Sequence, residues 1–213
     1  MKVNYELINF SLSLVKKMSK LYNIDESHSL RHSLDVFHNT KEIYESEIYL
    51  NPFLRHQQRE IYCSAIIHDM CDEKYIDKTT SINYLKNNMK FFVDDEEWKN
   101  IESIITTMSY SYIKKNGYPD LKNYNLAYNI VREADLLASY DVERCFVYNM
   151  YNVGEGEDYI TSIDSVENIF NNRMFKYIED GLFITEYSKK KAEKLHKNAK
   201  ERIMKIKTDR YIN

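Results

Sequence analysis

The residues best suited to chemistry stand at three places in the sequence: His28 and His32, the doublet His68-Asp69, and Asp135. The doublet directly follows the small and apolar run Ser64–Ile67, which is expected to be buried. A carboxylate that is buried without a partner is costly, so Asp69 requires a cation or hydrogen-bond donors. Asp135 presents the same problem, because it follows a largely apolar segment. One divalent ion would compensate both carboxylates.

Each of these places also has an ordinary structural explanation when it is taken alone. Two histidines four residues apart, such as His28 and His32, share one helix face whether or not they bind anything. An acidic residue in an apolar helix, such as Asp135, is often a solvated position at the helix edge. The doublet is the most informative, and the mixed set of imidazoles and carboxylates suits Mn, Fe, Co, Ni, Zn or Mg rather than a metal that prefers thiolates.

Helices are predicted to position these residues, because apolar residues recur at spacings of three and four along most of the chain. The first apolar stripe consists of Val3, Leu7, Phe10, Leu14, Met18 and Leu21. Asp25 or Ser27 is expected to cap the next helix, and Asp94 with Glu97 resembles a capping box. Because the alternation typical of strands is essentially missing, the sequence predicts an all-α fold.

Loops are predicted where glycine and proline occur, because these residues interrupt helices. Both residue types are few in this chain. The segments 116–119 and 154–157 contain three of the four glycines, and the fourth, Gly181, is expected to separate the last two helices. The final helix is rich in lysine. A single domain over residues 1–213 accounts for this pattern.

The order and context of the chemical residues resemble the HD superfamily of metal-dependent phosphohydrolases. In that family a histidine lies about one helix before an apolar run that ends in His-Asp, and an aspartate follows in an Ala-Asp-Leu context. The resemblance implies that His32, His68, Asp69 and Asp135 bind one divalent metal ion. It also implies a compact helical HD bundle over about residues 25–150, with N- and C-terminal flanking helices and a C-terminal helical extension over about 160–210.

Within the superfamily, the sequence is most similar to small stand-alone nucleotide phosphohydrolases and pyrophosphohydrolases. Their first ligand also follows another histidine by four residues, and an acid and a lysine come just after the doublet, as Asp72 and Lys74 do here. The aromatic residues usual between the two histidines are replaced by Ser29–Arg31. The two-metal members recruit further histidines between the doublet and the final aspartate. This chain has none there, which favours a single metal ion.

The resemblance also suggests roles beyond the metal ligands. Asp72 and Glu73 would orient or deprotonate the attacking water, and a helix that continued past the doublet would turn at least one of them toward the metal. His28 and Lys74 would contact the phosphate of the substrate. The alternatives are a solvated acidic turn, a structural histidine and a surface lysine. Weaker candidates for substrate contacts are Arg31, Arg132, Lys114, Lys115, Ser109 and Ser111.

The expected function is therefore hydrolysis of a phosphate ester or phosphoanhydride bond in a nucleotide or similar small phosphorylated metabolite. Two alternatives stay open: a non-catalytic, metal-stabilised HD binding module, and a phosphodiesterase of cyclic nucleotides or oligonucleotides. The retained acids Asp72 and Glu73 favour an enzyme over a binding module.

Composition limits the partners and the compartment. The formal net charge is −3, from 33 acidic and 30 basic residues, so no basic excess points to duplex nucleic acid. No apolar run is long enough for a membrane span. Three cysteines without CxxC spacing favour a reducing compartment, so a cytoplasmic location is expected. Self-association into a homo-oligomer is left open.

Overall fold

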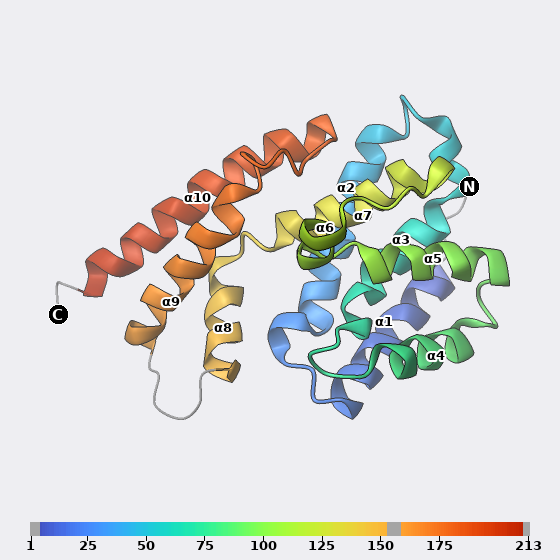
Figure 1. The fold of residues 1–213 in the computed structure, drawn as a ribbon, viewed down its shortest axis with the longest axis horizontal. Coiled ribbons are helices and arrows are strands. Elements are labelled where there is room, and N and C mark those ends of the chain that lie inside the picture. The colour runs from blue at the N-terminus through green and yellow to red at the C-terminus, as the bar shows by residue number, and fades with distance from the viewer. Residues whose placement is uncertain (1–4, 153–158, 211–213) are drawn as a thin grey trace.

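The computed structural model describes residues 5–152 and 159–210, and these residues form helices joined by turns, with no β-strand (Figure 1). The prediction of an all-α fold is confirmed. In chain order the α-helices are α1 (Tyr5–Leu21), α2 (Leu30–Glu47), α3 (Gln58–Ile67), α4 (Lys78–Met89), α5 (Asp95–Thr107), α6 (Tyr110–Asn116), α7 (Asn125–Ala138), α8 (Val142–Asn152), α9 (Tyr159–Asn172) and α10 (Glu186–Arg210). Short 3₁₀-helices lie between them: η1 (Glu26–His28), η2 (Pro52–His56), η3 (His68–Cys71), η4 (Lys122–Tyr124) and η5 (Met174–Lys176). None of the described helices combines the length and apolar character needed to cross a membrane.

Several helix boundaries follow the local sequence signals. Asp94 accepts from the backbone N–H of Glu97 while Glu97 accepts from that of Asp94, so the predicted capping box starts α5. Asp25 accepts from the backbone N–H of Ser27 and caps η1. The expectation that Asp25 or Ser27 caps α2 is wrong, because α2 begins after Ser29, whose side chain makes no capping bond. Gly117 ends α6 with φ +76°, a conformation that glycine adopts without strain. The predicted glycine loop at 154–157 lies outside the described residues.

The centre of the molecule is built from α2, α3 and α7. Helix α2 packs against both α3 and α7, while α1 and α5 pack against α3. The facing residues are fully buried and apolar, as Val36 and Ile66 show, and burial of such side chains is the main favourable contribution to folding. Of the predicted stripe on α1, Leu7, Leu14 and Met18 are buried, whereas Leu21 at the helix end is 58% exposed and Val3 is outside the described residues.

Helices α8, α9 and α10 lie together at one side of the molecule, coloured yellow to red in Figure 1, with α7 leading into them. Helix α8 packs on α9, and α10 packs on α7 and α9. As predicted, the last two helices are separated near Gly181, which has φ +64°. The long α10 buries Ala192, Ala199 and Ile203, and most of its lysines are exposed.

A buried carboxylate on α7 fixes the start of α10. Glu133 is fully buried, and its Oε1 accepts from the backbone N–H of Ile184 (2.7 Å) while its Oε2 accepts from the hydroxyl of Thr185 (2.6 Å). The neighbouring Arg132 donates to the carbonyl oxygen of Leu182 (2.6 Å). These bonds satisfy polar groups that would otherwise be buried without partners, so the attachment of α10 depends on Glu133.

We predict that Glu133→Ala lowers the free energy of unfolding by roughly 2–4 kcal/mol, because buried N–H and O–H donors would lose their acceptor. Urea denaturation followed by circular dichroism measures the change. The matched control is Glu193→Ala, which removes an exposed glutamate of α10 and should change stability by less than about 0.5 kcal/mol. Equal effects of the two substitutions would contradict this account.

Candidate metal centre

The three central helices bring the predicted metal ligands to one place. Helix α2 carries His32 and α7 carries Asp135, while His68 and Asp69 stand in η3, directly after α3. The apolar end of α3 is fully buried, as Ile66 and Ile67 show. Because this segment is buried, the doublet that follows it lies against His32 of α2 and Asp135 of α7.

The side-chain atoms of His32, His68 and Asp135 lie close enough to hold one metal ion, with one ligand atom of each within 4.8 Å of the others. Their two Nε2 atoms are 3.1 Å apart. Asp135 Oδ1 lies 3.2 Å from Nε2 of His32 and 3.7 Å from Nε2 of His68. The carboxylate of Asp69 joins the group, with Oδ2 3.3 Å from Nε2 of His32 and Oδ1 3.2 Å from Nε2 of His68. The structure thus brings all four predicted ligands together.

The chemistry of this donor set fits a divalent cation. His68 Nδ1 lies 2.9 Å from the carbonyl oxygen of Ala65, which can only accept, so Nδ1 carries a proton and neutral His68 presents a lone pair at Nε2. Such a backbone contact is how metal-binding histidines are commonly oriented. Nε2 of His32 faces that lone pair at 3.1 Å, and Asp69 Oδ2 is buried without a hydrogen-bond donor. A positive ion at this point satisfies all of them.

The electrostatics of the cluster also favour a cation. Burial by itself would lower the pKa of His68, but Asp69 and Asp135 outweigh it and raise that pKa to about 9. Burial, with the charge of Arg144, lowers the pKa of His32 to about 4. Burial would raise the pKa values of Asp69 and Asp135, yet the two imidazoles hold both well below the usual range. The two ionised carboxylates therefore favour a second proton on His68, at Nε2, and a divalent ion bound at that atom would supply the positive charge in place of the proton.

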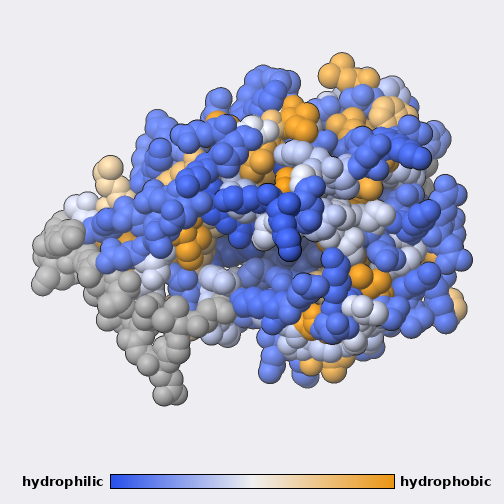
Figure 2. All heavy atoms as spheres, in the orientation of Figure 1, coloured by the Kyte–Doolittle hydropathy of each residue, from blue (hydrophilic) through white to orange (hydrophobic). Residues whose placement is uncertain are grey.

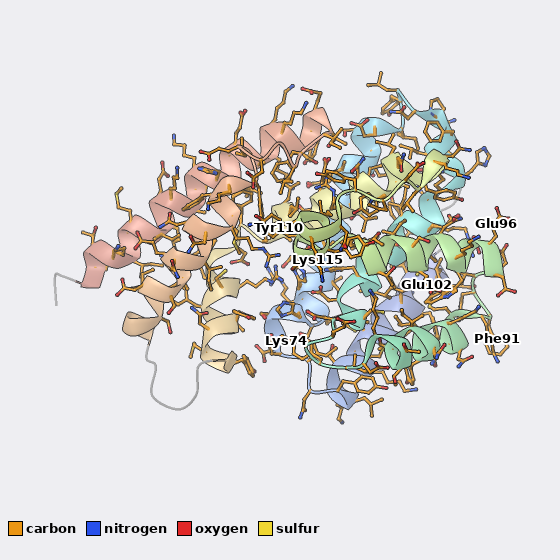
Figure 3. All side chains as sticks on the ribbon, viewed as in Figure 1. Lys74, Phe91, Glu96, Glu102, Tyr110 and Lys115 are labelled. Atoms are coloured by element: carbon orange, nitrogen blue, oxygen red, sulfur yellow. The ribbon has the colours of Figure 1, made fainter. Side chains whose placement is uncertain are left out.

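Two adjoining cavities open from this cluster, with volumes of about 520 and 420 Å³. Both are lined by Asp69, Asp72 and Asp135. Figure 2 shows a hollow near the middle of this face, surrounded mainly by hydrophilic residues. Lys74 and Tyr110 line the larger cavity and Lys115 the smaller one, and all three lie near the middle of the same view (Figure 3). The volumes are in the range of small-molecule sites.

The expectation that a helix continues past the doublet is wrong. Helix α3 ends at Ile67, the tighter η3 spans His68–Cys71, and Asp72 has an extended conformation with ψ 118°. Asp72 Oδ1 accepts from the backbone N–H of Lys74 (2.9 Å), a local bond that competes with helix formation. The turn nevertheless places Asp72 on the wall of both cavities and exposed Glu73 on the wall of the smaller one.

The two predicted substrate-contacting residues, His28 and Lys74, lie beside the predicted metal ligands. The ring centroids of His28 and His32 are 6.3 Å apart, and Nδ1 of His28 is 2.7 Å from the hydroxyl of Ser27. Lys74 Nζ lies 4.2 Å from the centroid of the Tyr148 ring and 3.6 Å from Asp25 Oδ2. His28 and Lys74 both line the larger cavity, so each has access to a ligand held there.

The weaker sequence candidates divide into two groups. Ser109 and Ser111 line both cavities. Arg31 is instead 82% exposed in its side chain and pairs with Asp35, and Arg132 is buried in the contact with Leu182 described above.

Sequence reasoning missed several residues that shape the larger cavity. Arg144 and Tyr148 come from α8, and Arg173 directly follows α9. No local motif marks them, because only the packing of the C-terminal helices brings them to the metal cluster. The hydroxyl of Tyr75, which was also missed, donates a hydrogen bond to Asp25 and lies 3.1 Å from Nδ1 of His28.

Solved structures share this fold over the whole chain. A Lactobacillus plantarum protein, a structural genomics target, matches with a TM-score of 0.71 and 17% sequence identity over 100% of both chains. Bacillus subtilis YpgQ matches with a TM-score of 0.67 and 18% identity over 96% of each chain. No protein-family model and no curated protein matches the sequence. At these identities, the likeness establishes a shared fold.

We predict that the protein purifies with close to one divalent metal ion per chain, and that His68→Ala and Asp69→Ala each lose it. Loss of one ligand leaves an incomplete, charged shell with much lower metal affinity. Elemental analysis after mild purification measures the content. The matched control, His38→Ala, removes an exposed histidine of α2 and should retain the ion. Full retention in both ligand variants would show that the assignment is wrong.

Proposed function

We propose that this chain is a member of the HD superfamily and a metal-dependent phosphohydrolase of nucleotides or similar small phosphorylated metabolites. The observation that carries the proposal is the convergence of His32, His68, Asp69 and Asp135 beside a cavity whose wall contains Asp69, Asp135 and cationic side chains. Lys74 lines that cavity beside the carboxylates, so it can compensate the charge of a phosphate group.

A divalent ion held by His32, His68, Asp69 and Asp135 would supply Lewis-acid chemistry and would lower the pKa of a bound water from 15.7 towards about 7–9. Side chains of the protein itself would orient the water and transfer protons. Asp72 is the best-placed proton acceptor, because it lines both cavities while its Oδ1 is held by the backbone N–H of Lys74. Glu73 is exposed and lines only the smaller cavity, so its part in orienting water is secondary to that of Asp72.

His28 is held in one orientation by its neighbours. Its Nδ1 faces the hydroxyl of Ser27 (2.7 Å), the hydroxyl of Tyr75 (3.1 Å) and Oδ1 of Asp25 (3.4 Å). With Nδ1 engaged in this way, Nε2 is the ring atom available to a ligand. A proton donated from Nε2 to a phosphate or leaving-group oxygen would support bond cleavage.

Screening the purified protein against a panel of nucleotides and simple phosphate esters, each with Mn, Mg, Co, Ni, Fe or Zn, tests the proposal. We expect metal-dependent release of phosphate or pyrophosphate from at least one nucleotide, and no release by His68→Ala. Hydrolysis only of cyclic nucleotides or oligonucleotides would favour a phosphodiesterase instead. Tight binding of a nucleotide without turnover under any metal would favour the non-catalytic binding module.

We predict that Asp72→Asn lowers turnover by roughly 10²–10⁴-fold while metal content and fold are retained, the usual contribution of a general base. The amide keeps the size and hydrogen bonding of the carboxylate but cannot accept a proton at neutral pH. Steady-state kinetics and elemental analysis of the same preparation separate this role from that of a ligand.

The matched control for Asp72 is Asp95→Asn, an exposed aspartate at the start of α5, which should leave turnover unchanged. Loss of metal from Asp72→Asn would indicate a ligand role. Unchanged turnover in Asp72→Asn, in Glu73→Gln and in the double variant would remove both acids from the mechanism.

A further inference from the structure

Two arginines from the C-terminal part of the chain line the same cavity as Asp69 and Asp135. Arg144 belongs to α8 and Arg173 directly follows α9. Within residues 5–152 and 159–210, neither guanidinium has a carboxylate within the 4.0 Å of an ion pair, unlike Arg59, which pairs with Glu97 at 2.6 Å. Cations that are half-buried without a counter-charge favour binding of an anion.

Each guanidinium is anchored through its Nε atom. Arg144 Nε donates to the carbonyl oxygen of Ser27 (2.6 Å), and Arg173 Nε donates to the hydroxyl of Tyr177 (2.8 Å). The Arg173 guanidinium also lies over the ring of Tyr110, 5.2 Å from its centroid. Among the described residues, the terminal nitrogens of both arginines have no hydrogen-bond acceptor, so they remain available to a ligand in the cavity.

The two charges act on the same small region. Burial raises the pKa of the Cys145 thiol to about 11, while Arg144 and Arg173 both oppose that rise. Arg144 also acts on His32, and Asp135 acts on Arg173, so the arginines are within electrostatic reach of the metal cluster. A ligand held at the metal would therefore meet both guanidinium groups.

We propose that Arg144 and Arg173 form an anion-binding pair that takes a phosphate group of the substrate, and that the C-terminal helices thereby form part of the substrate site. This inference rests on the proposed function for the identity of the ligand. A guanidinium presents its N–H groups in a planar fork that matches two phosphate oxygens, whereas a lysine supplies a point charge. The alternative is that the pair only balances the charges of Asp135 and Asp141, and the two accounts differ in what each arginine controls.

The test is binding of inorganic phosphate to the full-length, Mn-loaded protein, measured by isothermal titration calorimetry. We expect wild-type protein to bind phosphate, and Arg144→Gln and Arg173→Gln each to weaken binding by about tenfold to a hundredfold, since hydrogen bonds between charged groups are lost. Manganese content should stay unchanged in both. Arg173→Lys keeps the positive charge and should therefore bind phosphate more tightly than Arg173→Gln. This lysine variant also tests the proposal if Arg173→Gln folds poorly.

Arg202→Gln is the matched control, because Arg202 is a partly exposed arginine of α10 that contacts Glu143, and it should leave phosphate affinity unchanged. Absence of phosphate binding by the wild-type protein at millimolar concentrations would overturn the proposal, as would unchanged affinity in the double arginine variant. A changed manganese content with unchanged phosphate affinity would instead assign the pair to charge balance.

The phosphate assay is independent of turnover. Arginine-dependent binding without hydrolysis of any nucleotide in the panel would retain the anion site and reject the phosphohydrolase. Hydrolysis by a protein whose phosphate affinity and KM are unchanged by the arginine substitutions would retain the phosphohydrolase and reject the anion site.

Discussion

The contact of two half-buried carboxylates with two buried imidazoles is the constraint on which this molecule depends. His32 is 1% exposed, and His68, Asp69 and Asp135 meet it from two other segments of the chain. Such a cluster is stable only when positive charge is supplied and the surrounding packing holds each group in place. Helices α2, α3 and α7 provide that packing. Asn39 adds a bond from α2 to the carbonyl oxygen of Ala134, the residue before Asp135 (3.1 Å).

The residues of the candidate metal centre could be picked out from the sequence because their signals are local. The run Ser64–Ile67 indicates burial, and the aspartate of a His-Asp doublet at its end requires a cation or hydrogen-bond donors. The capping box at Asp94 is local in the same way, and the structure confirms it. The path of the chain after the doublet could not be predicted from periodicity. An aspartate such as Asp72 can continue a helix, or it can accept from a nearby backbone N–H and end the helix, and here it accepts from Lys74 N–H.

The walls of the cavity were beyond sequence reasoning for a different reason. Arg144, Tyr148 and Arg173 lie in segments that carry no motif, and they reach the cluster only through tertiary packing. Asp25 is a residue for which the sequence indicated only part of the role. The sequence suggested that Asp25 or Ser27 caps the helix that is α2, whereas Asp25 caps η1, accepts from the hydroxyl of Tyr75 and lies beside His28. A side chain such as Asp25 can bond both to a neighbour in sequence and to a residue far along the chain. Only the bond to the sequence neighbour can be predicted from the sequence.

Helix α7 explains why the C-terminal helices can act with the metal cluster as one site. Glu133 holds the start of α10 and Asp135 faces the imidazoles, and residues two apart on an α-helix point to nearly opposite sides. The same rigid element therefore carries a metal-site carboxylate on one side and the anchor of α10 on the other. The similar solved structures cover 96–100% of both chains, so the matched fold includes these last helices. Helix α10 also packs on α8 and α9, so the anchor at Glu133 supports both the helix that carries Arg144 and the helix that leads to Arg173, which is the kind of packing that holds ligand-binding side chains in position.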